Sequence, residues 1–137
     1  MDDVAHYQLG IDEMDVQHQY LFKLFDSLER GTTVSNSTAM KNVLAEIERF
    51  LNFHLHAEEY LMRIYEFPGF AVHQSDHENA VTKFLQFLDD FDAGRLNPAA
   101  LRIFLTGWLM EHSRQSDSLY AVYIKKKREE VFNSAVS

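Results

Sequence analysis

Apolar residues recur at every third or fourth position in four segments of this 137-residue chain. Three short stretches rich in Gly, Pro, Ser and Asn separate the segments, at residues 31–37, 66–69 and 93–98. This spacing places each apolar set on one face of an α-helix, whereas Gly and Pro favour breaks. At the last break, Asn97 followed by Pro98 is typical of a helix N-cap and the first helical position. The four stripes are Ile11, Met14, His18, Leu21, Phe25 and Leu28; Leu44, Ile47, Leu51, His54, Glu58, Leu61 and Tyr65; Phe70, His73, His77, Ala80, Phe84, Leu88 and Phe91; and Leu101, Leu105, Trp108 and His112.

Four amphipathic helices joined by short connections predict an all-α, antiparallel up-down-up-down four-helix bundle. At this length, residues 1–137 are expected to form a single domain with its own hydrophobic core. The core is expected to cover about residues 11–120, with residues 1–10 as a short N-terminal arm and residues 119–137 as a C-terminal tail. We expect the tail to continue as helix, with its run of charged residues solvated.

Ionisable side chains interrupt all four apolar stripes. Burying such a group costs several kcal/mol unless it is paired or bound to a metal. An antiparallel order of the helices places all of these residues at one level, near one end of the bundle. The stripes carry no Lys or Arg at that level that could neutralise a buried carboxylate. The sequence therefore predicts a metal site formed by His18, His54, Glu58, His73, His77 and His112.

Three further polar residues are expected to lie outside this site. His56 lies about 200° around the helix from His54 and should face solvent. Glu59 lies about 100° from Glu58, so we expect it at the surface or at the edge of the interior. His6 precedes the first helix and is interpreted as a surface or arm-packing residue.

Five imidazoles and one carboxylate are too many ligands for one zinc ion, which is usually four-coordinate. They suit two first-row ions, and histidine with bridging carboxylate is typical of iron or manganese. A second carboxylate would come from Asp117, five residues after His112. In a regular α-helix these two lie about 140° apart, whereas a π-bulge brings them onto one face. We therefore predict irregular helix geometry here; the competing choice, Glu111, points away from the stripe.

The charge and amino-acid composition of the chain exclude several classes of function. The net charge of −8 argues against nucleic acid as a partner, because a phosphate backbone attracts Lys and Arg. The chain has no cysteine, which excludes disulfides and thiolate metal ligands. It shows neither a signal peptide nor an apolar run long enough to span a membrane, so we expect a cytoplasmic location without membrane contact. A bundle that binds zinc or no metal would leave the shared level of the histidines unexplained.

Four motifs of the chain resemble the hemerythrin family, and in particular bacterial hemerythrin-like domains. They are DVQHQYL, HLHAEE, FPGFAVHQSDHE and WLMEHSRQSD, and the resemblance covers about residues 7–120. All seven ligand positions of the family are present in order: His18, His54, Glu58, His73, His77, His112 and Asp117.

This resemblance implies a non-haem di-iron site with an oxo or hydroxo bridge and two bridging carboxylates, Glu58 and Asp117. One iron would then be saturated, and the other would keep one position open for O2. The resemblance implies that His73, His77 and His112 hold the saturated iron and that His18 and His54 hold the other.

The resemblance also suggests how the site is used. Leu21, Leu55 and Trp108 match positions of the family's apolar O2 pocket, although plain core packing explains Leu21 and Trp108 equally well. Ser113 departs from the family, which usually has a bulky aliphatic residue there. The function implied is reversible binding of O2 for carriage, storage or sensing, without enzymatic activity. If the protein is a sensor, we expect it to be fused to a signalling domain or to contact one.

The alternative function is a di-iron oxidase, peroxidase or nitric-oxide-handling enzyme using the same ligands. The smaller Ser113 favours this alternative, and the lack of an obvious acid–base residue near the site counts against it. The expected partner in either case is O2 or another small diatomic or anionic ligand.

Overall fold

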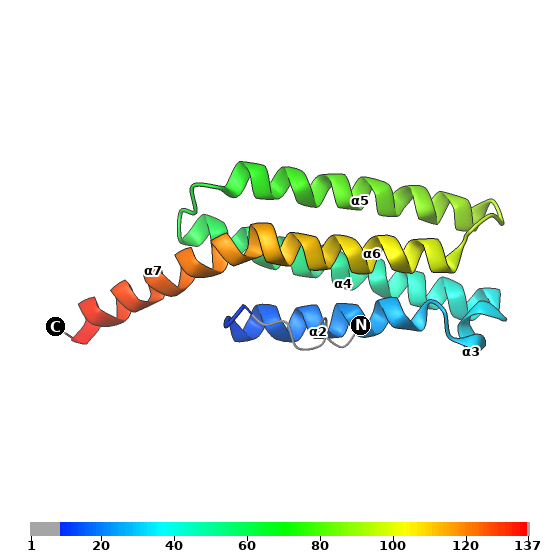
Figure 1. Ribbon diagram of the computed structural model, residues 1–137, viewed down its shortest axis with the longest axis horizontal. Helices are drawn as coiled ribbons and strands as arrows, with labels where there is room; N and C mark the ends of the chain where they lie inside the picture. Colours follow the sequence, from blue (N-terminus) through cyan, green and yellow to red (C-terminus); the bar gives the residue numbers. More distant parts are fainter. Residues whose placement is uncertain (1–8, 137) are drawn as a thin grey trace.

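The computed structural model describes residues 9–136, and this part of the chain is helical with no strand. Four long helices correspond to the four predicted segments (Figure 1). The predicted break at 31–37 contains one short helix that the apolar pattern did not indicate. The elements are α2 (Asp12–Ser27), α3 (Gly31–Val34), α4 (Ser37–Ile64), α5 (Phe70–Asp92), α6 (Pro98–His112), the π-helical turn η1 (Ser113–Asp117) and α7 (Ser118–Val136).

Local capping explains where the long helices begin and end. The Asn36 side chain accepts hydrogen bonds from the backbone N–H groups of Thr38 and Ala39 at the start of α4. Asn97 caps α6 in the same way, with Pro98 in the first turn, as predicted. Gly94, with φ of +74°, follows the end of α5 and takes the left-handed conformation that glycine accommodates most readily.

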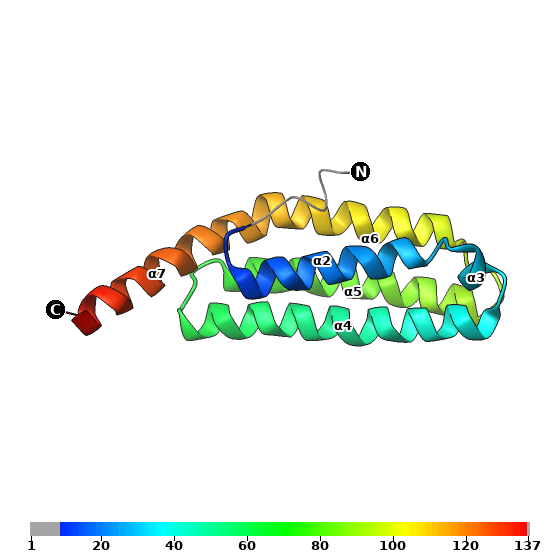
Figure 2. The same ribbon diagram turned by 90° about the horizontal axis from the view of Figure 1, so that it is seen from below.

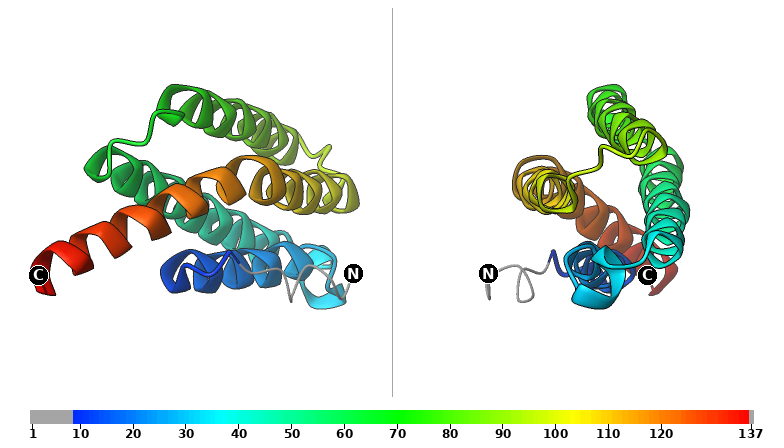
Figure 3. Two further views of the ribbon diagram at one scale, coloured as in Figure 1. Left: turned by 60° about the vertical axis from the view of Figure 1, so that its left-hand side comes forward. Right: turned by 90° about the vertical axis from the view of Figure 1, so that its right-hand side faces the viewer.

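The long helices pack as a bundle. Helix α2 packs against α4 and α6, and α5 packs against the same two helices (Figure 3). The end-on view in Figure 3 shows α5, α4, α2 and α6 in order around a shared interior. Each fully buried Leu, Ile or Phe in this interior contributes about 1.5–3 kcal/mol through removal of apolar surface from water. The main core cluster comprises Leu21, Phe25, Leu28, Met40, Leu44, Ile47, Leu51, Leu55, Phe84, Leu101, Leu105 and Leu109.

A second apolar cluster lies where α7 leaves the bundle. It comprises Leu9, Ile11, Met14, Met62, Tyr120, Ala121 and Ile124. The first turns of α7 therefore belong to a buried cluster, although the tail was expected to begin at residue 119. Lys125, Lys126 and residues 128–135 are exposed, as predicted for the charged run. Figure 2 shows the rest of α7 extending past the end of the other helices. His6 lies outside the described residues.

The first predicted stripe, from Ile11 to Leu28, is buried at every one of its members. The spacing of apolar residues therefore identified the buried face of α2. The polar members of the four stripes fall between the two clusters, since His18 lies between Met14 and Leu21 and Glu58 lies between Leu55 and Met62. In the described part of the chain, no helix is both long and apolar enough to cross a membrane.

Candidate metal centre

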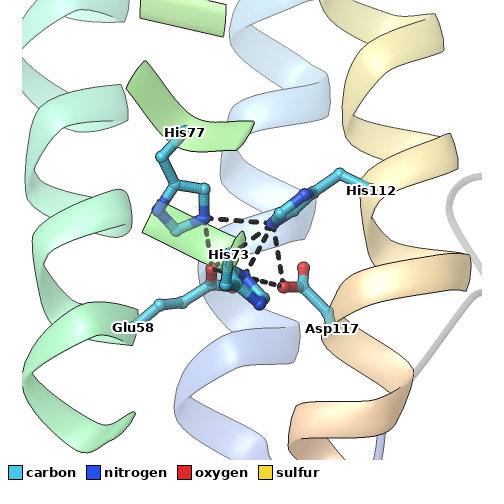
Figure 4. A group of neighbouring side chains, drawn as sticks. All are labelled: Glu58, His73, His77, His112 and Asp117. Carbon is cyan, nitrogen blue, oxygen red and sulfur yellow. Dashed lines mark hydrogen bonds and ion pairs between the residues drawn. The ribbon is translucent and has the colours of Figure 1, made fainter. Parts of the chain in front are cut away.

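The seven residues predicted to bind metal come together in the interior. Four of the long helices and the π-helical turn contribute them, and each is at most 3 % exposed. Figure 4 shows Glu58, His73, His77, His112 and Asp117 pointing toward one another from three sides. Helix α2 contributes His18; α4 contributes His54 and Glu58; α5 contributes His73 and His77; and the end of α6 with η1 contributes His112 and Asp117.

The π-helical turn brings the last two of these residues together. It covers Ser113–Asp117, where irregular geometry was predicted, and that prediction is confirmed. Because a π-helix pairs each residue with the fifth one along, His112 and Asp117 share a face. The His112 Nε2 atom lies 3.1 Å from Asp117 Oδ1. The competing choice, Glu111, is exposed and hydrogen-bonds Gln115, so it takes no part in the site.

Five potential metal-ligand atoms converge in one half of the site, which we call the five-donor half. It comprises Glu58, His73, His77, His112 and Asp117. The Nε2 atom of His112 lies 2.8 Å from that of His73 and 3.0 Å from that of His77. The Nε2 atom of His77 also lies 3.0 Å from Glu58 Oε1, and that of His73 lies 2.9 Å from Asp117 Oδ1.

The three-donor half comprises His18, His54 and Glu58. The Nε2 atoms of His18 and His54 lie 3.7 Å and 3.3 Å from Glu58 Oε2. His18 Nε2 is also 3.4 Å from Asp117 Oδ2. Each carboxylate therefore turns one oxygen toward each half, which is the arrangement that two neighbouring cations sharing both carboxylates would require.

Outer hydrogen bonds hold three of the five imidazoles. His54 Nδ1–H donates to Gln17 Oε1 at 2.7 Å, and His77 Nδ1–H donates to Glu59 Oε2 at 2.9 Å. His112 Nδ1–H donates to Asp76 Oδ2. A proton on Nδ1 leaves the Nε2 lone pair free to face the centre, as a metal-binding imidazole requires.

These outer partners were not identified from the sequence. Glu59 was expected at the surface or at the edge of the interior; it is 8 % exposed, so the edge position is confirmed and the surface position is wrong. His56 is exposed, as predicted. Gln17 and Asp76 each directly precede a ligand position, but only the rotation of neighbouring helices shows what they contact.

Close packing of charged groups sets the electrostatics of the site. Burial lowers the pKa of His112, but its contacts with Asp117 and Glu58 outweigh burial and raise the pKa to about 10. The same balance raises the pKa of His18 to about 9. Burial raises the pKa of Asp117, yet its close contacts with His112, His18 and His73 dominate and lower it below its ordinary value. For His54, burial dominates and lowers the pKa.

The donor set fits metal ions. Nε2 atoms of neutral imidazoles that face one another present two lone pairs, which repel unless a proton or a cation lies between them. Four buried ligand atoms make no hydrogen bond: His18 Nε2, His54 Nε2, Glu58 Oε2 and Asp117 Oδ1. Leaving such atoms unsatisfied costs about 1–3 kcal/mol each, and a bound cation would remove that cost. Nitrogen and oxygen ligands without thiolate suit first-row ions such as iron.

Of the predicted O2-pocket residues, Trp108 has ring contacts with ligand histidines, His77 and His112. Leu21 and Leu55 are buried in the main core cluster, and the half-buried Trp108 packs against it. The Trp108 ring also stacks on the His112 imidazole, with the centroids 4.6 Å apart. Ser113 is buried, and its Oγ lies 3.4 Å from Asp117 Oδ2. A role for these residues in a pocket stays a prediction.

An all-helical bundle with a buried cluster of histidines and carboxylates defines a class of metal-binding bundle proteins. The family model described as "Hemerythrin HHE cation binding domain" matches residues 9–124. The chain therefore belongs to the hemerythrin family.

Named relatives agree with this assignment. A bacteriohemerythrin of Stenotrophomonas maltophilia is 30 % identical over 117 residues, which are 85 % of this chain and 76 % of that protein. A hemerythrin-like protein of Naegleria gruberi is 30 % identical over 116 residues, covering 85 % of this chain and 87 % of the relative. A bacteriohemerythrin of Clostridium acetobutylicum is 23 % identical over 121 residues, covering 83 % and 93 %. No solved structure matches the chain.

Proposed function

We propose that this protein binds O2 reversibly at a non-haem di-iron site, for oxygen carriage, storage or sensing. The observation that carries the proposal is the division of the carboxylate oxygens: Glu58 and Asp117 each turn one oxygen toward the five-donor half and the other toward the three-donor half. Two adjacent cations bridged by both carboxylates would satisfy all of these atoms.

The two halves would differ in coordination. The five-donor half offers one iron three imidazoles and two carboxylate oxygens, and an oxo or hydroxo bridge would complete six ligands. The three-donor half offers fewer protein ligands, which would leave a position for O2. The proposed ligands are His73, His77 and His112 for one iron, His18 and His54 for the other, and Glu58 and Asp117 for both.

Protein residues would supply the environment and iron would supply the electrons for O2 binding. The imidazoles that donate through Nδ1 are fixed in orientation by Gln17, Glu59 and Asp76. Burial of every proposed ligand excludes bulk water from the centre. Leu21, Leu55 and Trp108 would keep the O2 side of the centre apolar and so limit the access of water and protons to it.

Ser113 supports a second candidate, a di-iron oxidase, peroxidase or nitric-oxide-handling enzyme. Its hydroxyl lies beside Asp117, where the family usually has a bulky aliphatic side chain. A hydroxyl there could donate a hydrogen bond to a bound ligand or admit water, and either would favour consumption of O2 over its release.

The two candidates differ in oxygen stoichiometry. We expect the reduced, iron-loaded protein to take up one O2 molecule per pair of iron ions in a closed oxygen-electrode cell. Uptake should stop there even when a reductant such as ascorbate is present. Continued uptake until the reductant is exhausted would contradict reversible binding and support an oxidase. Iron analysis of the same sample excludes a zinc-loaded bundle.

Several broader predictions belong to the same proposal. The chain is proposed to be a single domain with the up-down-up-down helix order, which the course of the chain in Figure 2 supports. A cytoplasmic location stays a prediction. So does contact with a signalling domain, for which α7 would be the connecting element because it extends past the bundle.

A further inference from the structure

The outer hydrogen bonds of the imidazoles differ in charge between the two halves of the centre. In the five-donor half, His77 and His112 both donate to carboxylates, those of Glu59 and Asp76. In the three-donor half, His54 donates to the neutral amide oxygen of Gln17. Among the described residues, the carboxylates that pair with His18 and His54 are only the shared ones, Glu58 and Asp117.

The two outer carboxylates lie in different surroundings. Glu59 is mostly buried and also accepts a hydrogen bond from Gln74 Nε2 at 3.1 Å. Both of its oxygens therefore accept hydrogen bonds from residues of α5, Gln74 and His77. Asp76 lies on α5 between the two ligand positions His73 and His77, and its side chain is 41 % exposed. Glu59 therefore acts on the five-donor half from the α4–α5 side of the bundle, and Asp76 acts on it from the α5–α6 side.

A carboxylate behind an imidazole makes that imidazole a stronger ligand. It fixes the Nδ1–H tautomer and adds negative charge that stabilises a cation on Nε2, and loss of such a partner typically costs 10–100-fold in metal affinity. An amide fixes the tautomer as well, but it adds no net charge. The five-donor half thus has both more ligands and more negative charge behind them.

We propose that Glu59 and Asp76 make the two halves of the centre unequal, so that a divalent cation fills the five-donor half first and the three-donor half second. This inference rests on the proposed dinuclear site and goes beyond it by assigning an order of loading. Glu59 and Asp76 are positioning residues, because they contact ligand imidazoles and belong to neither group of converging ligand atoms.

The test is an anaerobic titration of the metal-free protein with Co²⁺, followed by visible absorption in the presence of a competing chelator. Wild-type protein should bind two ions in successive steps, the first at least about tenfold tighter. Glu59→Gln and Asp76→Asn each keep one acceptor oxygen for the histidine Nδ1–H and remove the carboxylate charge. Each should weaken binding to the five-donor half about 10–100-fold, so that the gap in affinity between the two steps narrows or closes.

Two further variants distinguish the effect of a carboxylate hydrogen-bonded to a ligand histidine from the effect of any charge change near the centre. Gln17→Glu adds a carboxylate behind His54 and should tighten the second step. Glu78→Gln removes a carboxylate from α5 that lines the same α4–α5 groove, but within the described residues the Glu78 side chain makes no hydrogen bond or ion pair with a ligand histidine. It should change neither step, and thermal unfolding of each metal-free variant checks that the fold is retained.

The possible results distinguish the order of loading from the existence of the dinuclear site. Two steps of equal affinity in wild-type protein would overturn the order of loading and leave the dinuclear site standing. Equal weakening of both steps by Glu59→Gln and Asp76→Asn would overturn the role of these carboxylates in the same way. Failure of wild-type protein to bind a second ion would overturn the dinuclear site itself, and the order of loading with it.

Discussion

Within α4, neighbouring residues of the same chemical type have opposite roles, and the helix face decides which. His54 and Glu58 are one turn apart on the buried face, and both are fully buried. His56, two positions from each, is exposed. These three could be assigned from sequence because the helical period alone fixes them. Glu59 could not, because its burial depends on how closely α5 approaches the edge of α4.

Glu58 and His56 therefore give a sharp comparison at the residue scale. Glu58→Ala removes the carboxylate that both halves share, so metal content should fall from two ions to one or fewer per chain. His56→Ala should leave two ions bound, because its imidazole faces solvent. Iron analysis after reconstitution measures both. Equal losses from the two variants would show that the assignment of the buried face is wrong.

At the scale of elements, the π-helical turn decides whether the fourth helix completes the site. An apolar repeat identifies His112, but a regular helix would turn Asp117 away from it. The need for a second carboxylate predicted the irregular turn, and the structure has it at Ser113–Asp117. The contacts of Gln17 and Asp76 could not be predicted in this way, because they depend on the rotation of one helix against another.

Moving the carboxylate from position 117 to position 116 tests the geometry of this turn. Asp117→Ala should reduce metal content to one ion or fewer per chain. In a regular α-helix, a carboxylate at position 116 would replace it, since residues four apart share a face. In the π-helical turn it would not, so Ser116→Asp in the Asp117→Ala background should restore nothing. Recovery of full metal content in the double variant would mean that the segment binds metal as a regular α-helix.

For the whole molecule, the centre is a layer of polar side chains in an interior that is otherwise largely apolar. It lies between the main core cluster and the cluster formed with α7, and its ligands come from every long helix of the bundle. A cation bound there would link all four helices and stabilise the folded state by an amount that grows with the logarithm of its affinity. The family, the fold and the buried ligand set agree on a cation-binding bundle.

The most direct test of the proposed function is a cycle of oxygenation followed by visible absorption. Anaerobic, reduced, iron-loaded protein is titrated with O2 and then returned to argon. We predict that charge-transfer absorption appears with O2, disappears when O2 is removed and returns in the next cycle. Direct passage to a stable ferric spectrum that argon does not reverse would contradict reversible binding, and the di-iron enzyme would become the leading interpretation.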